Sequence, residues 1–306
     1  MGELGHFNDG LLHKIADGSD IEPLLKAGAN PNQLLMDGFN STPVHIAAQT
    51  ANKKALCLLI RYHADVNVVS KGGYTPLMRA MKKGDVETVH LLLEAGAYIN
   101  AKDDQDRTVL WWAAFYGQSM LIPLLKDKKA VINGADLSEK LTALMVACKY
   151  ADSKTVNALI SAGADVNQVS AYGYSALTFA ILNENKNEGL KIAKILILAG
   201  ADIHSKQNGS VKSLAPCPLV MATIQRHIPI LKLLLLYQAK GIREAFLYAK
   251  KADSKEVLAV FATCQKVKEL SFKISEIPQI IFPSKNNCYC IKRQKIIGEK
   301  APKKAN

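Results

Sequence analysis

Apolar residues recur at helical spacing in a stretch from Gly73 to Asn100 that sets the pattern for most of the chain. Thr75 is suited to cap a helix through its hydroxyl, and Pro76 follows at the first helical position, where a missing N–H is harmless. A Gly84-Asp85 pair then interrupts the helix. A second helix follows with one apolar face, which is formed by Val86, Val89, Leu92 and Leu93. The stretch therefore predicts two short helices and a polar turn, a unit too small to bury its apolar face alone.

The spacing of the capping residues indicates that this unit repeats. Successive caps are separated by 33, 33, 34 and 33 residues, and they are Thr42, Thr75, Thr108, Thr142 and Ser175. The distance from a cap to the Asn that closes its unit is constant at 25 residues, as from Thr42 to Asn67. Units of this kind stack on copies of themselves and bury a continuous core.

Several segments resemble the ankyrin repeat, whose pattern is a TPLHxAA opening, a Gly between the helices and a GADVN turn. They are TPVHIAA from Thr42, TPLM from Thr75, AGADVN from Ala162 and AGADI from Ala199. The resemblance implies an all-α solenoid of stacked antiparallel helix pairs. It also implies a β-hairpin-like finger across each pair, with finger tips and exposed first-helix ends forming one concave face.

The pattern places an ankyrin-repeat domain at residues 8–264 and a basic, irregular tail at residues 265–306. Seven to eight units are predicted, opening near residues 9, 42, 75, 108, 142, 175, 217 and 245. The unit from Ser175 is nine residues longer than its neighbours, because its helix pair is extended around residues 183–189 and its finger grows into a loop at residues 205–216. Such a loop could serve binding or reflect tolerated drift.

Composition and charge restrict the class of protein. The 306 residues are 49% apolar and 22% charged, which is a globular composition. The formal net charge is +12, and residues 265–306 carry ten Lys and Arg against three Glu, so +7 of it lies in the tail. No apolar run approaches the roughly 20 residues that span a bilayer, and the first residues lack the pattern of a secretory signal peptide. We therefore expect a cytosolic protein, or one secreted into a host cell without a cleaved signal peptide.

The sequence carries no motif of a catalytic, cofactor or metal site. Gly-rich phosphate loops, HExxH and G-x-S-x-G are absent. The six cysteines are scattered, and Cys288 and Cys290 have no further ligands at zinc-finger spacing. His45 is predicted to be structural, with its imidazole bonded to backbone of the neighbouring finger. We expect no catalytic residue, no cofactor and no metal.

Positions that the repeat leaves free are the candidates for partner binding. Aromatic and cationic residues dominate the finger tips and first-helix ends, and such residues contribute most at interface centres. Aromatic side chains near fingers can equally pack against neighbouring units, and Trp112 fits either interpretation. The predicted partner-binding residues are Lys71, Tyr74, Lys82, Lys83, Arg107, Trp112, Phe115, Tyr116, Lys149, Tyr150, Tyr172 and Tyr174.

These observations favour a non-enzymatic scaffold, a monomer that holds an acidic segment of a host protein in its concave face and takes no small-molecule substrate. The degenerate repeats and the Lys-rich tail resemble ankyrin effectors that intracellular bacteria translocate into host cells, although an animal or viral adaptor would look similar. The alternative is binding of nucleic acid or an anionic membrane through basic tail residues, which are Lys292, Arg293, Lys295, Lys300, Lys303 and Lys304.

Overall fold

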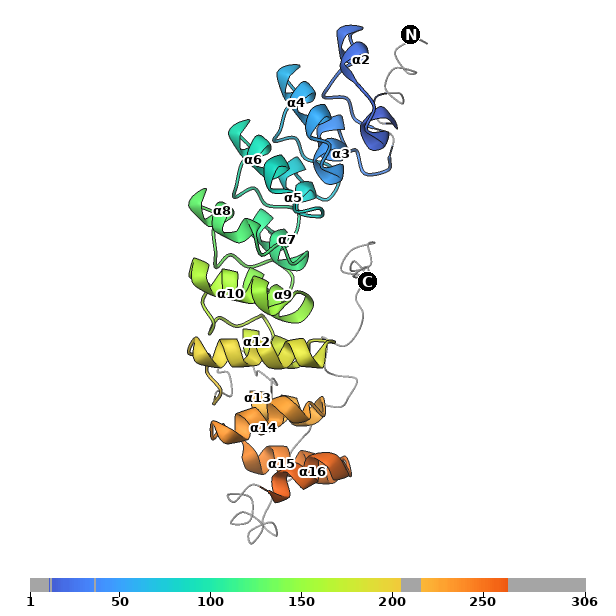
Figure 1. Cartoon of the computed structure of the whole chain (residues 1–306). Helices are drawn as coiled ribbons and strands as arrows, with labels where there is room; N and C mark the ends of the chain where they lie inside the picture. The colour runs from blue at the N-terminus through green and yellow to red at the C-terminus, as the bar shows by residue number, and fades with distance from the viewer. Residues whose placement is uncertain (1–10, 12, 36, 205–215, 264–306) are drawn as a thin grey trace. The chain divides into compact units, whose positions relative to one another are not determined.

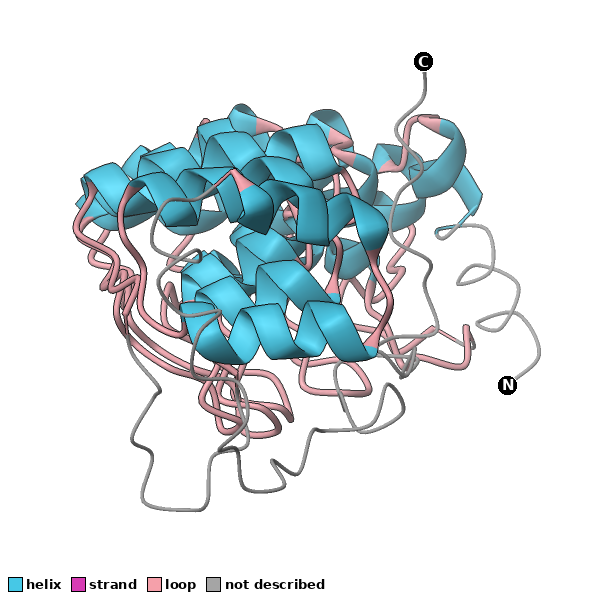
Figure 2. Cartoon of the chain, turned by 90° about the horizontal axis from the view of Figure 1, so that it is seen from below, coloured by secondary structure: helices cyan, strands magenta, loops and turns pink. Residues whose placement is uncertain are grey.

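The computed structural model describes Leu11 and residues 13–35, 37–204 and 216–263 (Figure 1). This part of the chain consists of helices joined by turns and contains no β-strand (Figure 2). The prediction of an all-α repeat structure is therefore confirmed. The basic tail and residues 205–215 of the predicted loop lie outside the described residues.

Residues 1–171 form one compact unit, whose helices alternate between two rows (Figure 1). The first helices of successive pairs contact one another in order, and they are α3 (Pro43–Thr50), α5 (Pro76–Ala80), α7 (Val109–Phe115) and α9 (Ala143–Tyr150). The second helices are α2 (Glu22–Lys26), α4 (Lys53–Arg61), α6 (Val86–Glu94), α8 (Leu121–Asp127) and α10 (Ser153–Ala162). Among these, α4 contacts α6, and α8 contacts α10.

One apolar face of each second helix builds the core between the rows. Leu59 of α4 and Leu92 of α6 are fully buried, and burial of such a side chain contributes roughly 1.5–3 kcal/mol. Val86, which was predicted to share this face, is 47% exposed. It is the first residue of α6, and helical side chains point toward the N-terminus, so no preceding turn lies beneath it.

Threonine side chains fix where the first helices begin. The Thr75 hydroxyl oxygen accepts a hydrogen bond from the backbone N–H of Met78 at 3.3 Å, which confirms the predicted cap. Thr108 and Thr142 cap α7 and α9 in the same way, at 3.4 and 3.3 Å. The opening at Thr42 instead forms a capping box with His45.

The turn before each of α3, α5, α7 and α9 folds back on itself as a short finger. Its pairing is limited to single bonds and bridges, such as the backbone N–H of Asp103 donating to the carbonyl of Arg107 at 3.1 Å. Neighbouring fingers are also linked, because the N–H of Lys71 donates to the carbonyl of Phe39 at 2.7 Å and that of Asp104 to the carbonyl of Gly72 at 3.1 Å. Side chains on successive fingers are thereby held side by side.

The described residues from 172 onward, 172–204 and 216–263, belong to a second compact unit. Its described helices are α11 (Ala176–Ile181), α12 (Lys186–Leu198), α13 (Pro218–Ile224), α14 (Ile228–Leu236), α15 (Ile242–Lys251) and α16 (Lys255–Ala262). Within it, α11, α13 and α15 contact in order, and so do α12, α14 and α16. Helix α12 has 13 residues against nine in α4 and α6, so residues within 183–189 lengthen this helix.

Candidate partner-binding face

The carboxylate of Asp103 shapes the finger before α7. Its Oδ1 accepts hydrogen bonds from the backbone N–H groups of Gln105 at 2.9 Å and Arg107 at 3.0 Å, which is the bonding by which Asp closes a turn over its own backbone. Asp136 does the same in the next finger, accepting from Glu139 and Leu141 at 3.1 and 3.0 Å. An Asp at this place thus sets the finger's conformation.

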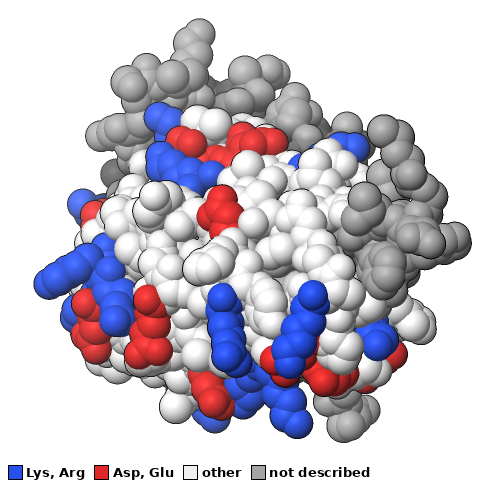
Figure 3. All heavy atoms as spheres, turned by 90° about the horizontal axis from the view of Figure 1, so that it is seen from above, with Lys and Arg blue, Asp and Glu red and all other residues white. Residues whose placement is uncertain are grey.

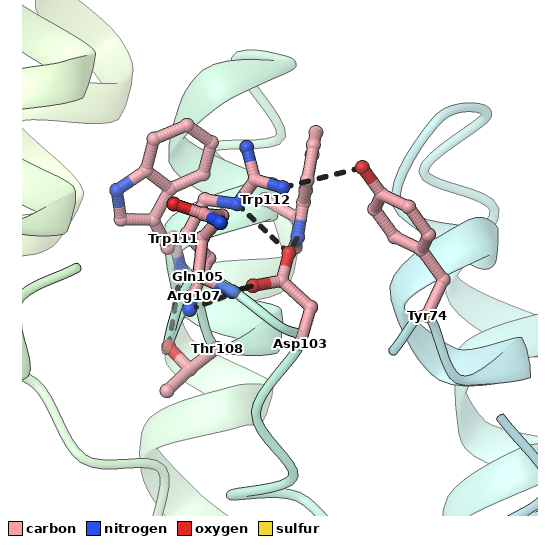
Figure 4. A network of polar contacts seen from close by, with 7 residues as sticks. All are labelled: Tyr74, Asp103, Gln105, Arg107, Thr108, Trp111 and Trp112. Atoms are coloured by element: carbon pink, nitrogen blue, oxygen red, sulfur yellow. Dashed lines mark hydrogen bonds and ion pairs between the residues drawn. The ribbon is translucent and has the colours of Figure 1, made fainter. Parts of the chain in front are cut away.

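The second oxygen of Asp103 connects two fingers through side chains (Figure 4). Its Oδ2 accepts from Nε of Arg107 at 2.8 Å and from the indole Nε1 of Trp112 at 3.1 Å. Nη2 of Arg107 then donates to the hydroxyl of Tyr74, on the preceding finger, at 3.2 Å. These four residues, Tyr74, Asp103, Arg107 and Trp112, are named the Asp103 network.

The charged pair of this network is buried. The side chain of Asp103 is fully buried and that of Arg107 is 8% exposed. Removing two charges from water costs several kcal/mol per ion and is offset only where further hydrogen bonds satisfy both groups. Here the carboxylate receives four donors, and the guanidinium carbon lies 4.6 Å from the ring centroid of Trp112. The network therefore holds Arg107 inside the protein.

Aromatic side chains continue from the network along the first helices. We name them the aromatic row, and its members are Tyr74, Trp111, Trp112, Phe115, Tyr116 and Tyr150. The ring centroids of Tyr74 and Trp112 are 5.4 Å apart, and those of Phe115 and Tyr150 are also 5.4 Å apart, both within the favourable range for aromatic pairs. Trp112 is buried, whereas Tyr150 is 38% exposed. The row thus has a buried base and an exposed edge.

The first helices next to this row carry cations and no carboxylates. Arg79 lies over the ring of Tyr74 at 4.5 Å, and Nζ of Lys149 lies 4.9 Å from the ring centroid of Tyr150. Helices α3, α5, α7 and α9 contain no Asp or Glu, whereas α6 contains Glu87 and Glu94. This segregation is local, because basic and acidic side chains of the described residues lie beside each other on the face in Figure 3.

The repeat place of Trp111 is taken by His45 in α3, and the predicted structural role of this histidine is confirmed. Its Nδ1 accepts from the backbone N–H of Thr42 at 3.1 Å, and its Nε2 lies 2.9 Å from the carbonyl oxygen of Tyr74. Burial lowers the pKa of the imidazole to about 4. The ring is therefore neutral at pH 7, so that Nε2 donates to the neighbouring finger.

The predicted binding residues differ in exposure. The exposed ones are Lys71, Lys82, Lys83, Tyr150 and Tyr172, the half-buried ones are Tyr74, Phe115, Tyr116 and Lys149, and the buried ones are Arg107, Trp112 and Tyr174. The expectation that Arg107 and Trp112 face a partner is corrected, because both are held inside the Asp103 network. Tyr174 is likewise buried and packs against Phe179 with ring centroids 6.1 Å apart. Tyr172 and Tyr174 belong to the second compact unit.

Sequence reasoning missed Asp103, Arg79 and Phe39. A signal for Asp103 was present, because Asp136 stands one repeat length later and Asp37 two repeat lengths earlier. No comparable signal marks Arg79 and Phe39, since their proximity depends on how two fingers and a helix pack. Within the described residues no group of three or more His, Cys, Asp or Glu side chains could hold a metal ion, and no helix is long and apolar enough to cross a membrane.

Comparison with known proteins gives one family. A family model for ankyrin repeats (three copies) matches residues 12–103 and 110–207. The chain is 35% identical over 116 residues to the ankyrin repeat protein nuc-2 of Neurospora crassa, an alignment that covers 36% of this chain and 11% of that protein. It is 30% identical over 217 residues to mouse Rabankyrin-5, covering 66% of this chain and 18% of the relative.

A third relative is the human transient receptor potential cation channel subfamily A member 1. The chain is 26% identical to it over 200 residues, which cover 61% of this chain and 17% of the channel subunit. The aligned part spans less than a fifth of the length of each of these three relatives. The similarity therefore concerns a part of each relative.

Proposed function

Because the chain belongs to the ankyrin-repeat family, we propose that it is a non-enzymatic scaffold that binds a protein partner through the fingers and first helices of residues 1–171. Ankyrin repeats indicate a scaffold for protein–protein interaction and are typically non-enzymatic. The observation that carries the choice of face is the exposed edge of the aromatic row.

This edge has the composition of an interface centre. Tyr150 is exposed, and Tyr74, Phe115 and Tyr116 are half-buried. Aromatic side chains held by a packed base lose little freedom on binding, because their rotamers are already restricted. The buried Asp103 network provides that base. A partner would therefore meet a surface whose contacting rings are already in place.

The charges beside the row favour an acidic partner segment. Lys82 and Lys83 are exposed just beyond the end of α5, and Lys149 lies near the end of α9. Helices α3, α5, α7 and α9 contain no Asp or Glu, so the first helices themselves set no like charge against the carboxylates of a partner. The proposed complex contains one copy of the chain and one partner.

The test compares two triple variants of the full chain in a quantitative pull-down. One combines Lys82→Gln, Lys83→Gln and Tyr150→Ala on the proposed face. The matched control combines the same exchanges at exposed positions of other segments, which are Lys54→Gln, Lys154→Gln and Tyr98→Ala. We expect the first variant to lose at least tenfold in capture of the proteins retained by the wild type, and the control to keep them. Equal capture by both variants would refute this face.

The biological setting is a separate proposal, namely that the scaffold is an effector which an intracellular bacterium delivers to a host protein. It rests on the Lys- and Asn-rich composition and on the basic residues 265–306. A translocation reporter fused to the full chain, compared with a variant lacking residues 265–306, tests it. Delivery that is unchanged without the tail would oppose a role of this segment in export.

The excess charge of the tail favours a second candidate function, binding of nucleic acid or an anionic membrane. Residues 265–306 carry ten Lys and Arg against three Glu. Binding of this kind releases counterions and falls steeply with added salt. Affinity for duplex DNA or anionic vesicles that is salt-sensitive and lost on removal of the tail would support it, and binding that persists without the tail would contradict it.

A further inference from the structure

Arg79 occupies an unusual position at the start of the aromatic row. Its guanidinium carbon lies 4.5 Å from the ring centroid of Tyr74 and 5.8 Å from that of Phe39, which is on the preceding finger. Phe39 is 55% exposed. The charged group is thus placed between two rings that belong to adjacent fingers, and one of these rings is open to solvent.

The guanidinium of Arg79 lacks an anionic partner among the described residues. Its Nε is buried without a hydrogen-bond acceptor, and no carboxylate lies within ion-pair distance. Arg107 provides the contrast, since its Nε is 2.8 Å from Asp103. Arg79 has therefore lost part of its hydration without the compensating bond that Arg107 has.

The groups around Arg79 do not supply the missing anion. Asp37, on the same finger as Phe39, uses its Oδ1 to accept from the backbone N–H groups of Phe39 and Ser41 at 2.9 and 3.3 Å. His45, which faces Arg79 from α3, is a buried neutral ring. Of the guanidinium nitrogens of Arg79, only Nε is both buried and unpaired. The terminal nitrogens present the planar edge that pairs with a carboxylate through two parallel hydrogen bonds.

We propose that Arg79 is the carboxylate anchor of the partner segment, with Phe39 and Tyr74 contacting an apolar side chain next to the bound carboxylate. The inference rests on the proposed scaffold function and specifies its ligand chemistry. The carboxylate comes from an Asp or Glu side chain or from the chain terminus of the partner. Lys82 and Lys83, one turn further on, attract a second carboxylate of the same segment.

The same geometry assigns a positioning role to Arg107. It holds the Tyr74 hydroxyl at 3.2 Å, and the Tyr74 ring forms one side of the place where Arg79 lies. Arg107 therefore acts on the partner through Tyr74 and does not touch it. This role explains why Arg107, which the repeat pattern predicts on the binding face, is buried beneath that face.

The experiment uses the full chain and three synthetic peptides of identical length with a Phe beside the test position. The first has two Glu and an amidated end, the second has two Gln and an amidated end, and the third has two Gln and a free terminal carboxylate. Both tryptophans of the chain, Trp111 and Trp112, lie in the aromatic row, so their fluorescence reports binding at this place. We expect a Kd for one carboxylate peptide that is at least about tenfold lower than for the amide control. The peptide that binds identifies the source of the carboxylate.

Variants at Arg79 decide whether it is the anchor. Arg79→Gln should remove the preference for carboxylate over amide, and Arg79→Lys should retain part of it, because the charge stays but the planar fork is lost. Arg61→Gln is the matched control at an exposed position of α4, and urea midpoints verify that each variant is folded. Preference that survives in Arg79→Gln, or a wild type that binds none of the peptides, would overturn the anchor.

Failure of the anchor is distinguishable from failure of the scaffold. If Arg79→Gln captures the same lysate proteins as the wild type, while the variant at Lys82, Lys83 and Tyr150 loses them, the face is right and the anchor is wrong. If neither variant loses any captured protein, the scaffold proposal itself is refuted at this face.

Discussion

The repeat openings at Thr42 and Thr108 are each hydrogen-bonded to the finger that carries Tyr74, but through different chemical groups. In the first, the neutral ring of His45 bonds to Thr42 and to the Tyr74 carbonyl. In the second, Trp111 stands at the same repeat position, and its buried Nε1 has no hydrogen-bond partner among the described residues. There the bond between fingers is made by Arg107, which is paired with Asp103 on its own finger and donates to the hydroxyl of Tyr74 on the preceding one.

Both openings bond to the same residue, Tyr74. His45 bonds to its backbone carbonyl oxygen, and Arg107 bonds to its side-chain hydroxyl. A backbone bond fixes only the finger, whereas the bond to the hydroxyl also fixes the ring. The opening at Thr42 therefore holds the finger of Tyr74 by its backbone, and the departure at Trp111 and Trp112 adds a buried base beneath the aromatic side chains of the row.

The largest loss of stability is expected when the buried ion pair of Asp103 and Arg107 is removed. Asp103→Ala leaves the guanidinium of Arg107 buried without its carboxylate, and breaking a buried pair in this way costs about 3–5 kcal/mol. Urea unfolding followed by tryptophan fluorescence measures it, because both tryptophans lie next to Arg107.

A nearby exposed pair is the control for that change. Asp106→Asn removes the ion pair between Lys102 and Asp106, whose atoms are 3.1 Å apart. Exposed pairs contribute about 0–1 kcal/mol. Similar losses in the two variants would mean that burial does not determine the effect, contrary to the explanation given for Asp103.

Acid should remove the stability that the buried neutral ring of His45 provides, because a protonated Nδ1 cannot accept from the N–H of Thr42. The pKa of His45 is about 4 in the folded chain and 6.5 ordinarily, because burial disfavours the charged ring and nearby Arg79 opposes it further. The hydrogen bond to the Tyr74 carbonyl and the charge of Asp37 act in the other direction but do not offset the burial. The unfolded chain binds its proton first, so stability is lost as pH falls from 6.5 to about 4. At about 1.4 kcal/mol per pKa unit, the loss is roughly 3 kcal/mol.

The slope of unfolding free energy against pH in this window is the measurement. It should flatten in His45→Leu and stay unchanged in His90→Gln, whose side chain is 48% exposed. The pKa of His227 is also lowered by burial, so a residual slope is expected in each case. An unaltered slope in His45→Leu would assign the acid sensitivity to other groups.

The features of these repeats that could be predicted are those that depend on residues close together in the sequence. Caps such as Thr75 and Thr108 were predictable because their hydroxyls bond within the next turn of the same helix. The burial of Arg107 was not, because it depends on Tyr74, a full repeat away in sequence, and on a carboxylate four residues earlier. The exposure of Tyr150 followed from the repeat phase, whereas the contact of its ring with Phe115 depends on how α7 and α9 pack. The division of residues 8–264 into units stays a prediction.

Close approach of the fingers can be tested at glycine. Gly73 has φ +75°, and a Cβ there would lie 2.7 Å from the backbone nitrogen of Asp104. Gly96 has φ +90°, but nothing lies within 4 Å of its Cβ position. Gly96→Ala should cost about 1 kcal/mol for the left-handed backbone alone, and Gly73→Ala about 2–3 kcal/mol because the adjoining finger must also move. Equal costs would contradict the contact between fingers.

The smallest loss of stability is expected at Tyr74, the residue to which His45 and Arg107 both bond. Tyr74→Phe removes the acceptor of Arg107 Nη2 but keeps the carbonyl used by His45, so we expect a loss of about 1 kcal/mol. In double-mutant cycles it should couple to Asp103→Ala by at least about 0.5 kcal/mol, because either change disturbs the same guanidinium. Its coupling to His45→Leu should be near zero. The opposite result, strong coupling to His45 and none to Asp103, would mean that the ring of Tyr74 is oriented by the backbone of its finger and not by the charged network beneath it.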